Sequence, residues 1–432
     1  ALLCDGELLA TAREESFSRT LGDSSFPRRA AHDCLRRAGL EARDLDQVVC
    51  SGKPLREFER VLATRMRAFP AGAGAFAQSL SSWLGEKLWI RNQAASELEL
   101  DSPHRVGFVS HLRCHANNAF LTSPFEEAAI LVIDEAREWE STLLARGTGT
   151  SVESLGTIRH PHSLAASERA LARAIGFEGG SAVERLRGAA HSGKASKLLL
   201  PYLPSSPQGG FAVSSELLDP NFELCGAEAS FEQRCDMAAS AQYALELRFL
   251  ELLHLLHERA PLPRLCLSGA MATNRSLVTA ALESGPFEEV FVPQDPTDSG
   301  TALGAALQAA QQRTPHAAPR FARAAPPETR PPLSVAGLGA MLDDLEAGKI
   351  IAWHRPGSLG VARVWSEASS DNAADKLRAA VQRNDRGLPT RVALPIENFP
   401  DYGELSSRCE EKSTSRLLSE ARLEVRATRA LR

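Results

Sequence analysis

The chain has 432 residues and a formal charge of −5, with 43% hydrophobic and 24% charged residues. This length allows two or three domains with cores of their own, and the composition is ordinary for a soluble protein. The acidic balance argues against a nucleic-acid partner, and no apolar run reaches the roughly twenty residues of a membrane-spanning helix. The eight dispersed cysteines form no CxxC pair. Because no signal peptide is visible either, we expect a cytoplasmic protein with reduced thiols.

The first third of the chain alternates short strands with helices. A hairpin is predicted over residues 1–10, where short apolar runs flank an Asp-Gly turn. A helix is predicted from Pro27 and a buried strand over residues 45–50. Residues 54–98 contain amphipathic segments, which are candidates for a homodimer interface.

The same alternation continues further along the chain. We expect strands at 128–133, 264–267 and 289–292 and helices at 231–259 and 304–312. Alternation of this kind predicts an α/β architecture, with ligands at the carboxyl ends of the strands.

A proline-dense stretch at residues 314–333 interrupts the pattern. Proline at this density cannot continue a helix or a central strand, so we interpret the stretch as a linker. It separates a domain of residues 1–313 from a second one of residues 334–432. The second domain is expected to open with a helix at 338–347 and a strand at 349–353.

Two histidines and two aspartates predict a metal site. His111 and His115 are four residues apart, so on a helix both imidazoles leave the same face. Asp134 ends an apolar run, and Asp298 opens a glycine-spaced turn before an alanine-rich helix. A lone HxxxH pair is usually an ordinary surface or packing feature, but the ordered set favours a hard metal site beside a phosphate-binding turn. Cys114 is interpreted as a small apolar residue away from the metal.

Several motifs in the same order resemble the carbamoyltransferase family that includes the nodulation and antibiotic O-carbamoyltransferases. The histidine motif is one of them. The others include Lys53-Pro-Leu-Arg-Glu-Phe-Glu-Arg60, Glu86-Lys-Leu-Trp-Ile-Arg91, Leu267-Ser-Gly-Ala-Met-Ala-Thr-Asn274 and Asp298-Ser-Gly-Thr-Ala-Leu-Gly-Ala-Ala306.

The resemblance implies a fold and an activity. A two-lobed actin/hexokinase-like (ASKHA) domain would be followed by a smaller α/β YrdC-like domain. The protein would transfer a carbamoyl group from carbamoyl phosphate, through an ATP-dependent carbamoyladenylate, to a hydroxyl of a small natural product or sugar. The cofactors implied are a divalent metal, Fe²⁺ in the first place, and ATP, with Mg²⁺ as a further candidate.

The resemblance also implies roles for single residues. His111, His115, Asp134 and Asp298 would bind the metal that holds the phosphate side of the adenylate. His111 and His115 would also serve catalysis, together with Arg363. Nucleotide binding is expected of Gly269, Asn274, Gly300 and Thr301, although a plain tight turn explains each glycine when it is taken alone.

The chain departs from the family in several places. Leu112 stands where a second histidine is usual, and Glu135-Ala-Arg137 replaces a glycine-bearing turn. Arg363 is the single candidate survivor of an arginine-rich motif in the second domain. These departures keep open a divergent, catalytically impaired homologue that acts as a binding or partner subunit. A third reading, the tRNA threonylcarbamoyl-transfer family, is disfavoured by the second domain and the acidic balance.

Overall fold

A computed structural model of the chain describes residues 1–313 with gaps at 19, 21, 22, 24, 68–79, 81, 82, 86, 207 and 208. Beyond residue 313 it describes only four short strands, β10 (Ile351–Trp353), β11 (Arg363–Trp365), β12 (Gly403–Leu405) and β13 (Val425–Ala427). The strand β10 lies within the one expected at 349–353. The linker at 314–333 and the helix expected at 338–347 lie outside the described residues, so the division into domains stays a prediction.

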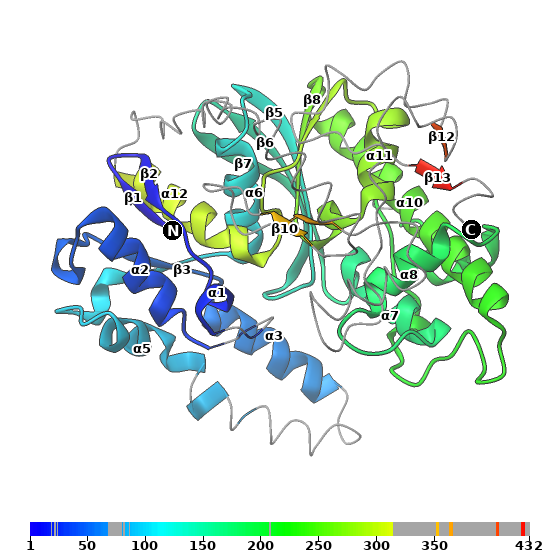
Figure 1. Cartoon of the computed structure of the whole chain (residues 1–432), viewed down its shortest axis with the longest axis horizontal. Coiled ribbons are helices and arrows are strands. Elements are labelled where there is room, and N and C mark those ends of the chain that lie inside the picture. Colours follow the sequence, from blue (N-terminus) through cyan, green and yellow to red (C-terminus); the bar gives the residue numbers. More distant parts are fainter. Residues whose placement is uncertain are drawn as a thin grey trace. The chain divides into compact units, whose positions relative to one another are not determined.

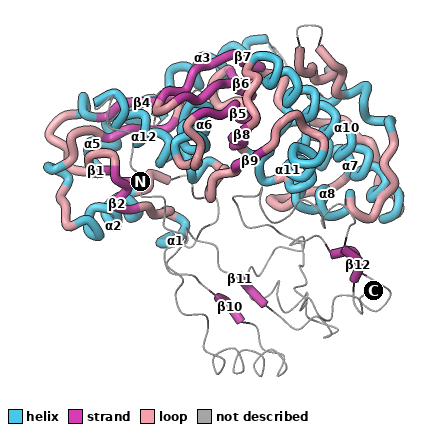
Figure 2. The backbone as a smooth tube through the Cα atoms, turned by 90° about the horizontal axis from the view of Figure 1, so that it is seen from above, coloured by secondary structure: helices cyan, strands magenta, loops and turns pink. Residues whose placement is uncertain are grey.

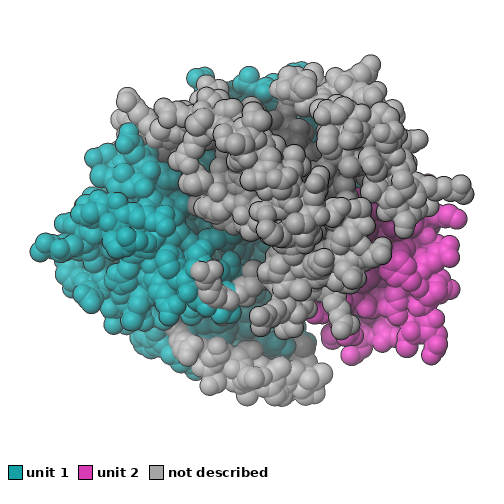
Figure 3. All heavy atoms as spheres, in the orientation of Figure 1, with its two compact units in different colours: residues 1–167, 200–219, 244–323 teal, residues 168–199, 220–243, 324–432 magenta. Residues whose placement is uncertain are grey.

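The chain groups into two compact units. Unit 1 consists of residues 1–167, 200–219 and 244–323, and unit 2 of residues 168–199, 220–243 and 324–432 (Figure 3). All residues of the candidate site described below belong to unit 1.

The first α/β part of unit 1 contains two pairs of strands. The antiparallel hairpin β1–β2 turns at Asp5 and Gly6, both with positive φ, as the Asp-Gly signal predicts. The strands β3 and β4 pair in parallel. The elements are β1 (Leu2–Cys4), β2 (Glu7–Ala10), α1 (Glu15–Ser18), α2 (Arg28–Ala38), β3 (Val48–Ser51), α3 (Pro54–Arg67), α5 (Ile90–Glu97), β4 (Val106–Val109) and α6 (His111–Leu121).

A five-stranded mixed sheet forms the second α/β part, in the order β7-β6-β5-β8-β9 (Figure 2). The central strand β5 pairs antiparallel with β6 and parallel with β8. It is buried from its second residue onward, which explains its uninterrupted apolar sequence. The strands are β5 (Glu127–Ile133), β6 (Glu140–Thr148), β7 (Ser151–Arg159), β8 (Arg264–Ser268) and β9 (Glu289–Phe291).

Helices fill the remainder of the described chain. The α-helices are α7 (Leu164–Ile175), α8 (Ala182–Ala190), α9 (Ser215–Leu218), α10 (Phe231–Arg259), α11 (Arg275–Glu283) and α12 (Thr301–Arg313). Short 3₁₀ helices are η1 (Ala42–Asp44), η2 (Lys87–Trp89), η3 (Pro103–Arg105), η4 (Lys197–Tyr202), η5 (Ala270–Thr273) and η6 (Asp298–Gly300). None of the helices in the described part of the chain is long and apolar enough to cross a membrane.

The helices α6 and α12 pack closely and bring distant parts of the sequence together (Figure 1). Gly304 makes this contact possible, because a Cβ atom there would collide with the backbone carbonyl of Cys114. The same helix contributes Leu112, Ala116 and Phe120 to a buried apolar cluster with β5. The helix that carries both histidines is therefore fixed between the central strand and α12.

The expected α/β class is confirmed, and the predicted strand at 128–133 and helix at 231–259 are present. The prediction omitted β6 and β7, which form the antiparallel side of the sheet. The element order of the first part, a hairpin and then two parallel strands separated by helices, recurs in the second part as β6–β7, β8 and β9.

Candidate metal centre

The helix α6 presents His111 and His115 one turn apart, as the spacing predicts. Both side chains are buried, and their rings meet edge to face with centroids 4.7 Å apart. The two Nε2 atoms are 3.3 Å apart. Each ring therefore directs the same nitrogen into a shared space.

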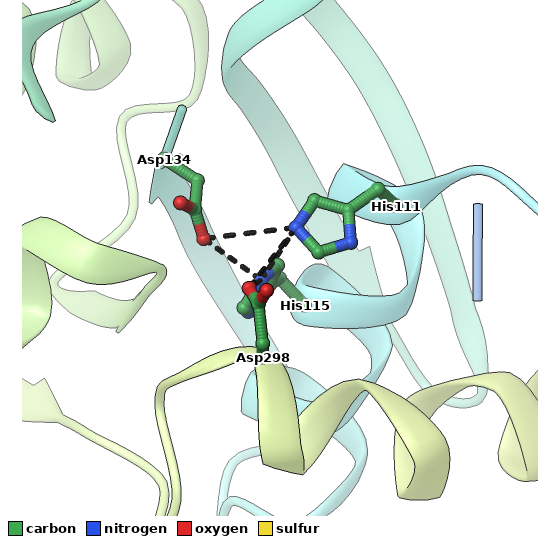
Figure 4. Close-up of side chains that lie close together, drawn as sticks. All are labelled: His111, His115, Asp134 and Asp298. Atoms are coloured by element: carbon green, nitrogen blue, oxygen red, sulfur yellow. Dashed lines mark hydrogen bonds and ion pairs between the residues drawn. The ribbon is translucent and has the colours of Figure 1, made fainter. Parts of the chain in front are cut away.

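Two carboxylates from other segments complete this space (Figure 4). His115 Nε2 lies 2.9 Å from Asp134 Oδ2 and 3.7 Å from Asp298 Oδ1. His111 Nε2 lies 3.8 Å and 3.3 Å from the same two oxygens. Asp134 follows β5 directly and is buried, whereas Asp298 starts η6 and is 56% exposed.

The four donor atoms lie within 4.8 Å of one another, a set that could hold one metal ion. Tetrahedral ligation with bonds of about 2.0–2.2 Å separates neighbouring ligand atoms by about 3.3–3.6 Å, close to the spacings found here. Asp134 Oδ2 is also buried, 2.9 Å from His115 Nε2 and 3.8 Å from His111 Nε2. A bound cation would replace these contacts with a bond to the carboxylate. Two imidazoles and two carboxylates suit iron, zinc or manganese rather than calcium.

Two serines contact the outer nitrogens of the histidine rings, and neither was predicted to have this role. Ser51 Oγ, at the end of β3, lies 3.3 Å from His111 Nδ1. Ser268 Oγ, at the end of β8, lies 3.3 Å from His115 Nδ1. Hydrogen bonds to the outer nitrogen leave Nε2 as the ligating atom of each ring.

A buried glutamate, Glu138, ties the start of α6 to the segment before α3. Its Oε1 atom accepts hydrogen bonds from the backbone N–H of Lys53 at 2.9 Å and of His111 at 3.1 Å. A carboxylate at a helix N-terminus is stabilised by the unpaired amides there. Glu138 thus fixes the position of His111, a role that no spacing in the sequence indicated.

The altered turn after Asp134 places a cation beside the site. Arg137 Nη2 lies 3.1 Å from Asp298 Oδ2, while Oδ1 of the same carboxylate faces the histidines. Arg60 Nε donates to the Arg137 carbonyl oxygen at 3.0 Å, which secures the turn. Asp298 therefore offers a single oxygen to a metal while Arg137 holds the other.

The pKa values in the cluster reflect its charges. Burial alone would lower the pKa of His115, but contacts with Asp134 and Asp298 outweigh it and raise that pKa to about 9. Burial opposes ionisation of both carboxyls, yet the two histidines hold the pKa of Asp134 and of Asp298 well below the ordinary value. In the metal-free chain, His115 is therefore protonated and positively charged at neutral pH. A bound metal would supply the positive charge in place of that proton.

Cys114 takes no part in the cluster. Its sulfur lies 3.8 Å from the carbonyl oxygen of Val109, and burial raises the pKa of the thiol to about 12. The prediction that this residue is an apolar neighbour of the histidines is confirmed.

Each position expected to bind nucleotide also has a structural role within the protein: the two glycines allow close backbone packing, and Asn274 and Thr301 form hydrogen bonds to the backbone. Gly269 has a φ of 92°, and a Cβ there would collide with the Ile133 carbonyl; a Cβ on Gly300 would collide with the Asp295 carbonyl. Asn274 caps α11, with its side chain accepting from the backbone of Leu277 at 3.4 Å. Thr301 Oγ1 donates to the Asp298 carbonyl oxygen at 2.6 Å. Nucleotide binding by these four residues stays a prediction. Arg363 opens β11, and its side chain lies outside the description.

Together, fold and site define an α/β protein with a buried cluster suited to a divalent metal. The profile of the family described as "Carbamoyltransferase N-terminus" matches residues 1–307. The chain therefore belongs to the carbamoyltransferase family, and the resemblance seen in the motifs is confirmed.

Two relatives illustrate the match. An uncharacterised protein of Synechocystis, sll1178, is 34% identical over 333 residues, which are 71% of this chain and 54% of the relative. Nodulation protein NolNO of Sinorhizobium fredii is 31% identical over 323 residues, or 71% of this chain and 45% of the relative. The chain thus spans about half the length of these relatives.

Solved structures are similar only at a low level. The activator of the 2-hydroxyisocaproyl-CoA dehydratase from Clostridium difficile, with bound ADPNP, is 16% identical at a TM-score of 0.36, covering 67% of this chain and 82% of that one. HypF from T. kodakarensis is 16% identical at a TM-score of 0.33, covering 52% and 39%.

Proposed function

We propose that the protein transfers a carbamoyl group to a hydroxyl of a small natural product or sugar. The observation that carries the proposal is the convergence of His111, His115, Asp134 and Asp298 on one point in a member of the carbamoyltransferase family. The donor would be carbamoyladenylate, formed when water converts carbamoyl phosphate to carbamate and phosphate and the carbamate then displaces pyrophosphate from ATP. The metal would be Fe²⁺, with Mg²⁺ accompanying ATP.

The proposed transfer is a simple displacement. The acceptor oxygen forms a bond to the carbamoyl carbon, the bond from that carbon to the phosphate oxygen breaks, AMP leaves, and the hydroxyl proton passes to solvent. A bound divalent ion would neutralise phosphate charge and polarise the mixed anhydride. The protein's own part is to hold the ligands in place: Ser51 and Ser268 orient the rings, and Glu138 fixes the start of α6.

The finer assignments belong to the same proposal. Residues 1–313 would form the actin/hexokinase-like domain, and the recurring element order of its two α/β parts supports that arrangement. The nucleotide would be surrounded by Gly269, Asn274, Gly300 and Thr301. These residues lie at or beside η5 and η6. The first of these helices follows β8, whose Ser268 contacts His115, and the second begins with Asp298. Arg363 and a YrdC-like domain at 334–432 would serve adenylate formation.

Pyrophosphate release tests the proposal. Iron-loaded protein is given ATP and carbamoyl phosphate, and His111→Ala is compared with His104→Ala, which alters an exposed histidine in η3. We expect release by the wild type and by His104→Ala, and loss of release in His111→Ala would show that adenylate formation at 334–432 is coupled to the metal site. Folded, metal-loaded wild type that releases no pyrophosphate would contradict the complete activity in this chain.

One observation favours the second candidate, an impaired homologue that acts as a binding or partner subunit. The Arg137 guanidinium pairs with Asp298 in a turn where glycine is expected, so a side chain and a positive charge stand beside the metal ligands. Metal binding without pyrophosphate release would support this candidate.

A further inference from the structure

A pocket of about 310 Å³ adjoins the metal cluster, with which it shares His111. Its walls come from the segment at Lys53 and Arg56, from the first turn of α6, and from β6 and β7. The volume is at the lower end of the range for sites that bind small molecules. Of the four residues in the metal cluster, only His111 lines this pocket, so the metal site gives the pocket no role.

Three cations and two carboxylates line the pocket, but the carboxylates are already engaged. Glu138 accepts two backbone N–H groups through Oε1. Glu140 Oε1 lies 3.4 Å from Arg56 and 3.9 Å from Arg159. Arg56, Glu138 and Glu140 therefore already have partners within the protein.

Lys53 and Arg113 remain without a carboxylate partner among the described residues. The Lys53 ammonium takes part in no ion pair there, although its backbone N–H is held by Glu138. Arg113 is half-buried, its Nε atom donates to the neutral Gln308 side chain at 3.3 Å, and it forms no ion pair with any of the described residues. A half-buried guanidinium without a counter-charge is costly to keep in a folded protein unless an anion joins it.

We infer that this pocket binds the acceptor and that Lys53 and Arg113 hold an anionic group on it, such as a carboxylate or a phosphate. The inference rests on the proposed carbamoyl transfer and names the class of its acceptor, a small hydroxylated anion. Ser154 and Thr157 of β7 offer hydroxyls to a polyol, and Leu112 and Leu143 form an apolar wall. Since His111 belongs to both pocket and cluster, a hydroxyl at that end would face the reacting centre.

Inorganic phosphate is the probe, titrated calorimetrically into metal-free protein without nucleotide. Arg113→Gln and Lys53→Gln each remove one charge and keep most of the side-chain length. Arg43→Gln is the matched control, because that arginine is 79% exposed and lies in η1 away from the pocket. A charge-assisted hydrogen bond lost from a half-buried site lowers affinity by about tenfold or more.

We expect each pocket variant to bind phosphate at least about tenfold more weakly, and Arg43→Gln to bind like the wild type. An ATP analogue at saturation should leave phosphate binding unchanged. Equal affinity in all variants would overturn the inference. Competitive displacement by the ATP analogue would also overturn it, because the pocket would then hold nucleotide phosphates. The titration needs neither metal nor turnover, so its outcome is separate from that of the pyrophosphate assay.

Discussion

Ser268 Oγ lies 3.3 Å from His115 Nδ1 and also donates to the Pro296 carbonyl oxygen at 3.3 Å. A hydroxyl has a single proton, so in this arrangement the ring Nδ1–H must donate to Ser268. Neutral His115 then carries its lone pair on Nε2, the atom that faces Asp134. The serine therefore selects the tautomer that metal binding requires.

Replacing this serine should weaken the metal site. We expect Ser268→Ala to lower the affinity for Fe²⁺ or Zn²⁺ by about 10–100-fold, the usual effect of losing a partner that orients a ligating histidine. Competition with a coloured chelator measures the affinity. The control Ser25→Ala removes an exposed hydroxyl bound to Asp23 and should have no effect. Equal affinities would show that Ser268 does not orient the ring.

Metal binding should depend on pH because of His115. Its pKa is raised to about 9 in the metal-free chain, so the ring is protonated at pH 7 and must release that proton to a metal. The apparent affinity should rise between about pH 6 and about pH 9, by at most tenfold per unit, and then level off. Calorimetry at pH 7 in two buffers of different ionisation enthalpy should show proton release. A binding enthalpy independent of the buffer would contradict this expectation.

Gly304 should be intolerant of a side chain. We expect Gly304→Ala to destabilise the protein by about 1–3 kcal/mol or more, since the added methyl meets the backbone of α6 rather than a movable side chain. Metal affinity should fall as well, because α12 begins just after Asp298. In the control Gly188→Ala, within α8, nothing lies within 4 Å of the added atom, so a stabilisation of up to about 1 kcal/mol is expected. Urea unfolding compares the two variants.

Removing Arg137 should strengthen metal binding slightly. The Arg137 guanidinium pairs with Asp298 and so competes with a metal for the charge of that carboxylate. Because both side chains are about half exposed, the gain in metal affinity is limited to about fivefold. Arg137→Gln should therefore raise metal affinity, and the gain should shrink at high salt. A loss of affinity on substitution would mean that Arg137 chiefly positions Asp298.

The sequence predicted those parts of the fold whose residues carry a local pattern. The long helix α10 and the buried strand β5 have clear apolar periodicity, and both were located well. Strands β6 and β7 were missed. Buried and exposed residues do not alternate regularly along β7, and its pairing with β6 contains register shifts. Their existence depends on the pairing of β6 with β5 and of β7 with β6, which no local pattern records.

The metal ligands could be predicted for a similar reason. A helical repeat relates His111 to His115, and a strand end marks Asp134. Ser51 and Ser268 carry no such mark, because a serine that orients a ring looks like any other serine until the fold places it there. The same is true of Glu138, whose two partners lie in separate segments.

The most direct test of the metal centre is a titration with one divalent ion, Zn²⁺ or anaerobic Fe²⁺, of the wild type and four ligand variants. His111→Ala, His115→Ala, Asp134→Asn and Asp298→Asn form the set, with the exposed His104→Ala and Asp101→Asn as controls. We expect one ion per chain in the wild type and in both controls. Each ligand variant should lose more than about 100-fold in affinity, beyond the loss from an orienting partner alone. Wild-type affinity in folded variants of His115 and Asp134 would contradict the assignment of this cluster as a metal site.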